Sequence, residues 1–173
     1  GDVVRIVGNG GADGDLGTSA DNLSYEIGRD ALSRALSDGT SLEVPQGVTV
    51  MVDAGAVLKM RRSSIEVGST SIGVDRSRAA LQLLGTPQTS VYVTSLNDDS
   101  MGVDSNPFDT EPDAGDWGGI LVRSDLDRAE GRPDFEADAI FLNYISNADL
   151  RYGGGKVVID SVEQVVAPVQ MLD

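Results

Sequence analysis

The chain has 173 residues, of which 40% are hydrophobic and 24% are charged, as expected of one folded domain. It contains no His and no Cys, which excludes Ser-His-Asp triads, thiol nucleophiles, disulfides and zinc sites built from these residues. The net charge of −15 argues against nucleic acid as a partner, and no apolar run approaches the roughly 20 residues that a membrane-spanning helix needs.

The first segment, residues 1–41, shows little regular alternation of apolar and polar side chains. We expect an irregular entry segment that caps the first edge of the strands that follow, because an uncovered edge invites pairing with another chain. The run from Asn9 to Asp15 is similar to one calcium turn of a nonapeptide β-roll, but it occurs only once. A Gly-rich polar turn is therefore the simpler interpretation.

Residues 42–173 contain short β-like runs separated by turn residues, and no run has helical spacing. Alternation is clearest in Val48–Asp53 and Ser64–Val67, which indicates strands with one buried face. The other predicted strands are Leu42–Val44, Ala56–Arg61, Ala80–Leu84, Ser90–Ser95, Gly119–Arg123, Ile140–Ile145, Ala148–Tyr152 and Lys156–Asp160. The sequence therefore predicts an all-β protein.

The bends between these strands distinguish two all-β architectures. They are short and contain Gly or Pro, whereas a sandwich of hairpins favours two-residue Asp-Gly or Asn-Gly turns. Three strands with their corners make a repeat of about 20 to 25 residues, which is typical of a stacked solenoid. We therefore predict a right-handed parallel β-helix that continues beyond residue 173. Its predicted inward side chains are Val50, Val52, Val57, Ile65, Val67, Leu81, Leu83, Val91, Val93, Ile120, Val122, Leu150 and Val157.

Three motifs, in order along the chain, carry a family resemblance. They are Val-Pro-Gln-Gly-Val-Thr with Gly-Ala-Val-Leu-Lys-Met in 44–60, Leu-Gly-Thr-Pro with Gly-Asp-Trp-Gly-Gly-Ile in 84–120, and Ala-Asp-Leu-Arg-Tyr-Gly-Gly-Gly in 148–155. Together they resemble the parallel β-helix repeat region of very large, adhesin-like exported bacterial surface proteins. The resemblance implies a scaffold at the cell surface or outside the cell, and it implies no catalytic residues.

The loop 97–116 is the strongest candidate site, with seven carboxylates and no basic residue. Ca²⁺ takes six to eight oxygen ligands in flexible geometry, so such a loop suits it. The candidate ligands are Asp98, Asp99, Asp104, Asp109, Asp113 and Asp116. No EF-hand spacing is present, and the alternative is a solvated acidic loop.

Two further features bear on carbohydrate chemistry. Trp117 is the only Trp, and beside two glycines it is expected to pack over the backbone rather than to form an exposed sugar platform. The only local basic cluster is Lys59, Arg61, Arg62, Arg76 and Arg78. In β-helix polysaccharide lyases an Arg base works beside calcium-binding carboxylates, so an enzyme would need such groups on one face. Outward arginines paired with Asp on a neighbouring turn of the chain are the simpler interpretation.

These features predict a non-catalytic structural or adhesive module of a large exported bacterial protein. It would act as a rigid spacer or associate with itself or with neighbouring domains of the same protein, without nucleic acid and without membrane insertion. One alternative is a β-helix lyase or hydrolase acting on polysaccharide. The other is a carbohydrate-binding module that recognises surface carbohydrate.

Overall fold

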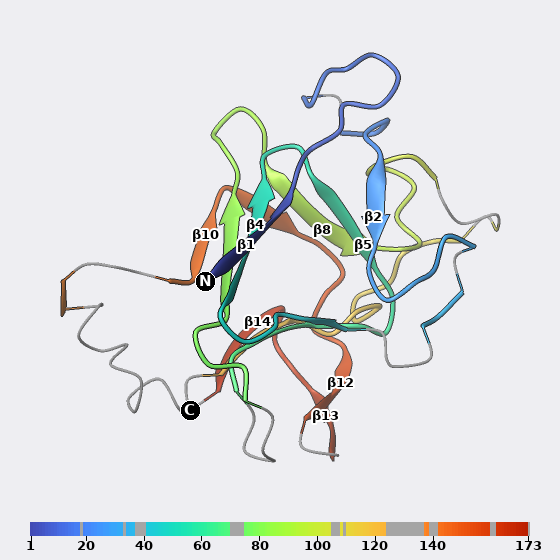
Figure 1. Cartoon of the computed structure of the whole chain (residues 1–173). Helices are drawn as coiled ribbons and strands as arrows, with labels where there is room; N and C mark the ends of the chain where they lie inside the picture. The colour runs from blue at the N-terminus through green and yellow to red at the C-terminus, as the bar shows by residue number, and fades with distance from the viewer. Residues whose placement is uncertain are drawn as a thin grey trace.

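The computed structural model is an all-β protein built mostly from parallel strands (Figure 1). It describes residues 1–17, 19–32, 34–36, 41–69, 75–104, 108, 110–123, 137–138, 142–159 and 162–172. None of its helices is both long and apolar enough to cross a membrane, within these described ranges.

Three parallel sheets of four strands each form the body of the molecule. The first sheet contains β1 (Asp2–Ile6), β4 (Val48–Asp53), β7 (Ala80–Leu84) and β10 (Tyr144–Ser146), side by side in that order. The second contains β2 (Ser24–Glu26), β5 (Val57–Met60), β8 (Val91–Ser95) and β11 (Ala148–Leu150). The third contains β3 (Leu42–Glu43), β6 (Ile65–Val67), β9 (Ile120–Arg123) and β14 (Val169–Leu172).

The chain passes through the three sheets in a fixed order and then begins again. We call three successive strands, one from each sheet, a circuit, so that β1 to β3 form the first circuit and β10, β11 and β14 form the fourth. Each strand hydrogen-bonds in parallel to its counterpart in the adjacent circuit. In Figure 1 the three sheets surround a common interior.

One apolar core lies between the sheets, and every sheet contributes to it. Its side chains include Val50, Val52, Leu81 and Leu83 from the first sheet, Leu58, Met60, Val91 and Val93 from the second, and Ile65, Val67, Ile120 and Val122 from the third. Equivalent residues of adjacent circuits are register partners, as Val52 is with Leu83 and Leu58 with Val93. The core side chains therefore stack in columns from one circuit to the next.

Glycines at the corners let successive circuits approach closely. Gly68, after β6, has a φ of 94°, and a Cβ placed there would lie 2.1 Å from the carbonyl oxygen of Arg123 in the next circuit. Gly55, between β4 and β5, has a φ of 79° and would meet the Leu16 side chain at 2.8 Å. Both positions therefore combine a left-handed backbone with a contact that excludes a side chain.

The predicted all-β class is confirmed, and every predicted run overlaps a strand in the described part of the chain, although Ile140–Ile145 does so only in its last two residues. Two strands in the segment 1–41 were not predicted. β1 and β2 pair with β4 and β5, so this segment extends two of the sheets in addition to its irregular stretches. The signal was weak because both strands carry exposed polar or charged residues among their apolar ones.

Two of the predicted inward residues, Val57 and Val157, differ from the prediction. Val57 is buried but lies on the outer face of β5, whose inward residues are Leu58 and Met60. The prediction was shifted by one residue, which exchanges the two faces of a strand. Val157 is buried in a separate outer cluster with Leu121 and Val166. Leu150 packs against the main core as predicted and is partly buried.

One antiparallel element stands outside the three sheets. β12 (Lys156–Ile159) pairs with β13 (Val162–Val165) in a hairpin inserted between β11 and β14. The sequence predicts Lys156–Asp160 as a further parallel strand, and this expectation was wrong. The outer cluster explains the difference, because Val157 and Val166 cover Leu121 on the outer face of β9.

Candidate functional site

The acidic loop 97–116 connects β8 to β9, and its first residues are tightly held. Asp98 is almost fully buried, and its carboxylate accepts hydrogen bonds from the hydroxyls of Thr94 and Ser100 and from the Ser100 amide at 3.1 Å. The Asp98 amide donates to the carbonyl oxygen of Ser95 at 3.1 Å. The burial of this carboxylate is therefore compensated by donors from β8 and from the loop itself.

A second carboxylate, Asp116, joins the two ends of the loop. Its Oδ2 atom accepts a hydrogen bond from the Ser95 hydroxyl, from the Asn97 side-chain amide at 3.3 Å and from the Asp113 backbone amide at 3.1 Å. Thr110 adds a hydrogen bond from its hydroxyl to the Asn97 side-chain oxygen at 3.2 Å. Asp98 and Asp116 thus act as internal anchors that shape the loop.

The loop also covers a cation that sequence analysis did not connect with it. Lys59, on the outer face of β5, is completely buried, and its Nζ donates a hydrogen bond to the carbonyl oxygen of Val103 at 3.2 Å. Burial lowers the pKa of Lys59, and the negative charges of Asp99, Asp104, Asp98 and Glu26 oppose this effect. Part of the loop's negative charge is therefore balanced by a lysine from the preceding circuit.

A signal for this arrangement is present in the sequence. Lys59 lies between Leu58 and Met60, which face the core, so alternation places the lysine on the outer face of the strand. Its register partner is Thr94 in β8, shortly before the loop begins. The signal can be used only once the register between β5 and β8 is known.

The predicted calcium ligands occupy different environments. Asp98 is buried and Asp116 half-buried, and both serve as anchors, whereas Asp99, Asp104 and Asp113 are exposed. Asp109 lies outside the described residues. No group of three or more His, Cys, Asp or Glu side chains that could hold a metal ion occurs in the parts of the chain that the structure describes.

Calcium binding by loop 97–116 stays a prediction. If Ca²⁺ binds the folded loop, isothermal titration calorimetry should give a binding heat, and the melting temperature should rise with calcium concentration by mass action. The variant Asp99→Asn removes one exposed candidate ligand and leaves the Asp98 and Asp116 anchors in place, so it should weaken calcium binding without unfolding the loop. No heat, together with a melting temperature that does not respond to a chelator, would contradict the prediction.

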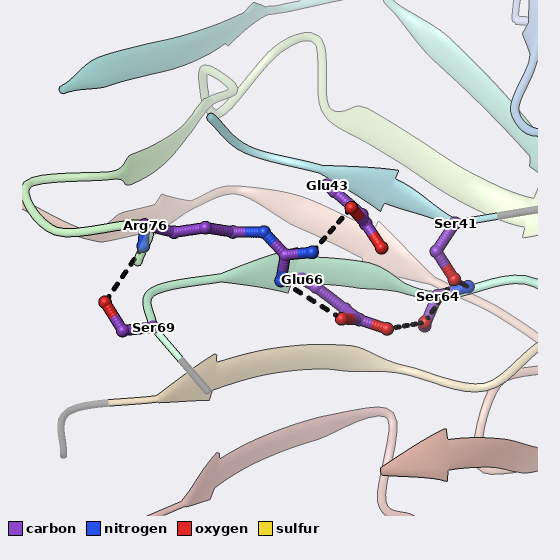
Figure 2. Close-up of polar contacts among 6 residues, drawn as sticks. All are labelled: Ser41, Glu43, Ser64, Glu66, Ser69 and Arg76. Carbon is purple, nitrogen blue, oxygen red and sulfur yellow. Dashed lines mark hydrogen bonds and ion pairs between the residues drawn. The ribbon is translucent and has the colours of Figure 1, made fainter. Parts of the chain in front are cut away.

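The basic cluster is divided between two sheets. Figure 2 shows Arg76 beside the outer face of the third sheet, where it forms ion pairs with Glu43 of β3 and, at 3.4 Å, with Glu66 of β6. The Ser64 hydroxyl donates to Glu66 at 3.2 Å, and the Arg76 amide donates to the Ser69 hydroxyl at 3.0 Å. Arg76 thus bridges two neighbouring glutamates of adjacent circuits and offsets part of their negative charge.

This division bears on the enzyme alternative. Arg76 is paired over the third sheet, while Lys59 lies beneath the acidic loop on the second sheet. Arg62, at the corner after β5, approaches the loop through its backbone, with its amide donating to the Asp116 carbonyl oxygen at 2.8 Å. Of the basic cluster, Lys59 and Arg62 therefore come close to the acidic loop.

Trp117 has a structural role, as predicted. It is completely buried, its Nε1 donates to the carbonyl oxygen of Arg151 at 2.6 Å, and its ring packs against Gly153 so closely that a Cβ there would lie 2.9 Å away. Gly155 and Gly118 donate backbone hydrogen bonds around the same corner. A side chain without exposed surface cannot be a platform for sugar stacking.

The Gly-rich segment from Asn9 to Gly17 has the hydrogen bonds of polar turns. The side chains of Asn9, Asp13 and Asp15 each accept a hydrogen bond from the backbone amide two residues further on, at 3.1, 2.7 and 2.8 Å. This is the geometry of successive Asx turns. The turn interpretation is therefore sufficient to explain these residues.

Comparisons with known proteins do not indicate a family or a function for this chain. No family model matches the chain, and searches of curated proteins and of solved structures also give no match.

Proposed function

We propose that this chain is a non-catalytic structural module, a segment of a right-handed parallel β-helix from a large exported bacterial surface protein. The fixed order in which the chain visits three parallel sheets supports the β-helix. The sequence motifs in 44–60, 84–120 and 148–155 support the surface location by their resemblance to adhesin-like repeats. The module would serve as a rigid spacer or an adhesive, self-associating element.

One observation carries the proposal: the apolar columns are buried in the middle circuits and exposed in the fourth circuit. In the first sheet Leu83 is fully buried, whereas the next residue of its column, Ile145, is 44% exposed. In the third sheet Val122 is 9% exposed and Met171, its partner in the fourth circuit, is 75% exposed. Inward-facing apolar residues of an end circuit are thus left in water.

Within the residues that the structure describes, the inward side chains of the two end circuits are not charged. Natural edge strands avoid pairing through inward-pointing charges, prolines or bulges. The inward residues of the end circuits are instead apolar, namely Ile6, Tyr25 and Leu42 in the first circuit and Ile145, Leu150, Val169 and Met171 in the fourth. Such ends are complementary to a further circuit of parallel strands.

The experiment compares two substitutions on one strand by sedimentation velocity. We expect the wild-type protein to associate with increasing concentration and Met171→Lys to weaken this association by tenfold or more, because burying an unpaired charge costs more than ~1.4 kcal/mol. Gln170→Lys adds the same charge on the outer side of β14, where the lysine stays in water, and should therefore not weaken association. Wild-type protein that stays monomeric at all concentrations would contradict self-association.

The enzyme alternative predicts a different result. A lyase or hydrolase would release unsaturated or reducing sugars from a polysaccharide panel. Arg62→Ala is the variant of choice for such an assay, because Asp98 is a buried anchor whose loss would disturb the fold. Activity of the wild-type protein that disappears in a folded Arg62→Ala variant would overturn the structural proposal, and binding of a polysaccharide without turnover would favour a carbohydrate-binding module.

A further inference from the structure

We propose that residues 99–103, an early part of the acidic loop, form a latch over the outer face of β5, and that this latch opens by local unfolding while the three sheets stay paired. Opening exposes the buried amine of Lys59 to water. The inference concerns a movement within the chain, so it depends neither on the proposed function nor on calcium binding.

The latch links the third circuit directly to the first. It follows β8, and it reaches the segment before β2 through hydrogen bonds from the Gly102 amide to the Ser19 carbonyl oxygen at 2.7 Å and from the Val103 amide to the Asn22 carbonyl oxygen at 2.9 Å. Between β8 and β2 in the second sheet lies β5 of the second circuit. The latch therefore spans a complete circuit, whereas the repeats of a solenoid usually contact only their neighbours.

Side chains on the outer face of β5 are buried beneath the latch. A Cβ on Gly102 would lie 3.2 Å from the Cγ1 atom of Val57, and the carbonyl oxygen of Val103 accepts the hydrogen bond from Lys59. Val57 and Lys59 are both completely buried, although neither belongs to the main core. The latch, rather than the core, therefore keeps water away from these two side chains.

The latch can open without the loss of a strand pair. Residues 99–103 belong to no strand, and the main core includes none of their side chains within the described part of the chain. Asp98, directly before the latch, is fixed to β8 by its hydrogen bond with the Thr94 hydroxyl and can remain there as a hinge. Closure also buries the Lys59 ammonium group, which costs free energy. Segments with few core contacts and such opposing terms open well before the whole protein unfolds.

Gly102 provides a variant that acts on the latch. Its φ of 67° is left-handed, which disfavours other residues, and a Cβ there would lie 3.1 Å from the Asn22 carbonyl oxygen. Gly102→Ala therefore strains the closed latch, and opening relieves the strain. Gly47 is the matched control, because its φ is 69° and a Cβ there would have no atom within 4 Å. Gly47→Ala places similar backbone strain at the corner before β4.

The experiment measures how fast the lysines react with the N-hydroxysuccinimide ester of acetic acid, in the presence of a chelator. The neutral amine attacks the ester carbonyl, an amide forms, and N-hydroxysuccinimide leaves with the proton of the amine. The chain has two lysines, and Lys156, whose side chain is 67% exposed, is the internal reference. Peptide mass spectrometry gives the rate at each lysine, with and without urea below the unfolding transition.

We expect Lys59 to react about tenfold or more slowly than Lys156, at a rate that low urea hardly changes, because local opening exposes little surface. Gly102→Ala should accelerate Lys59 by about fivefold or more, whereas Gly47→Ala should leave it near the wild-type rate. Equal rates at both lysines in the wild type would show that the latch is not closed. A Lys59 rate that rises steeply with urea, or rises equally in both variants, would show that only global unfolding exposes it. Each of these results would overturn the inference.

Discussion

Replacing Trp117 by Ala is expected to lower the free energy of unfolding by about 3–5 kcal/mol. The side chain is completely buried in the main core, and its removal leaves a cavity and an unpaired Arg151 carbonyl oxygen. Urea denaturation followed by far-UV circular dichroism measures the change. Trp fluorescence cannot serve as the probe, because Trp117 is the only Trp in the chain.

The control for this prediction is Trp117→Phe, which keeps an aromatic ring but removes the indole N–H. We expect it to cost about 1–2 kcal/mol, since it loses one hydrogen bond and part of the packing against Gly153. If the free energy of unfolding of Trp117→Ala lies within about 1 kcal/mol of the wild-type value, the stability of the corner formed by residues 115–120 does not depend on the Trp117 ring.

Lys59 should respond in opposite ways to two substitutions. Lys59→Ala is expected to destabilise the protein by about 2–4 kcal/mol, because it leaves a cavity beneath the acidic loop. Lys59→Met keeps the volume and removes a buried charge, so its stability should equal or exceed that of the wild type at neutral pH. Both values come from urea denaturation, and a Met variant as unstable as the Ala variant would show that the charge itself is needed.

The pH dependence provides a second measurement on the same lysine. Because burial lowers the pKa of Lys59, the unfolded chain binds more protons than the folded protein between the folded and unfolded pKa values. The contribution of Lys59 to stability should therefore rise as the pH increases through that interval, and its unfavourable contribution is fully present below it. The stability difference between Lys59→Met and wild type should shrink from about pH 7 to about pH 10, and a constant difference would contradict this.

Local alternation and turn residues were enough to predict the all-β class and most of the strands. Val48–Asp53 and Ser64–Val67 alternate clearly, and both are strands with the expected inward residues. The inward orientation predicted for Val57 was wrong. Ala56, Val57, Leu58 and Met60 are all apolar, so the sequence pattern does not distinguish the two faces of β5.

The candidate site could be predicted only in part, because its contacts join distant parts of the chain. The acidic loop was evident from composition, but the use of Asp98 and Asp116 as anchors depends on hydroxyl groups of Thr94 and Ser95 at the end of β8. Lys59, which lies beneath the loop and donates to the Val103 carbonyl oxygen, precedes Val103 by 44 positions in the sequence. Pairings of this kind follow from strand register, which a single sequence does not specify.

The separation of the strands into circuits has a consequence for how such a protein can change in length. In the part of the chain that the structure describes, the strands of one sheet hydrogen-bond to the corresponding strands of adjacent circuits, and the inserted hairpin β12–β13 leaves the pairing of β14 with β9 intact. Gain or loss of a whole circuit by duplication or deletion would therefore create or remove contacts only at the two layers beside it. A protein with this pairing can therefore change in length in steps of one circuit, without changes to the core contacts of the other circuits.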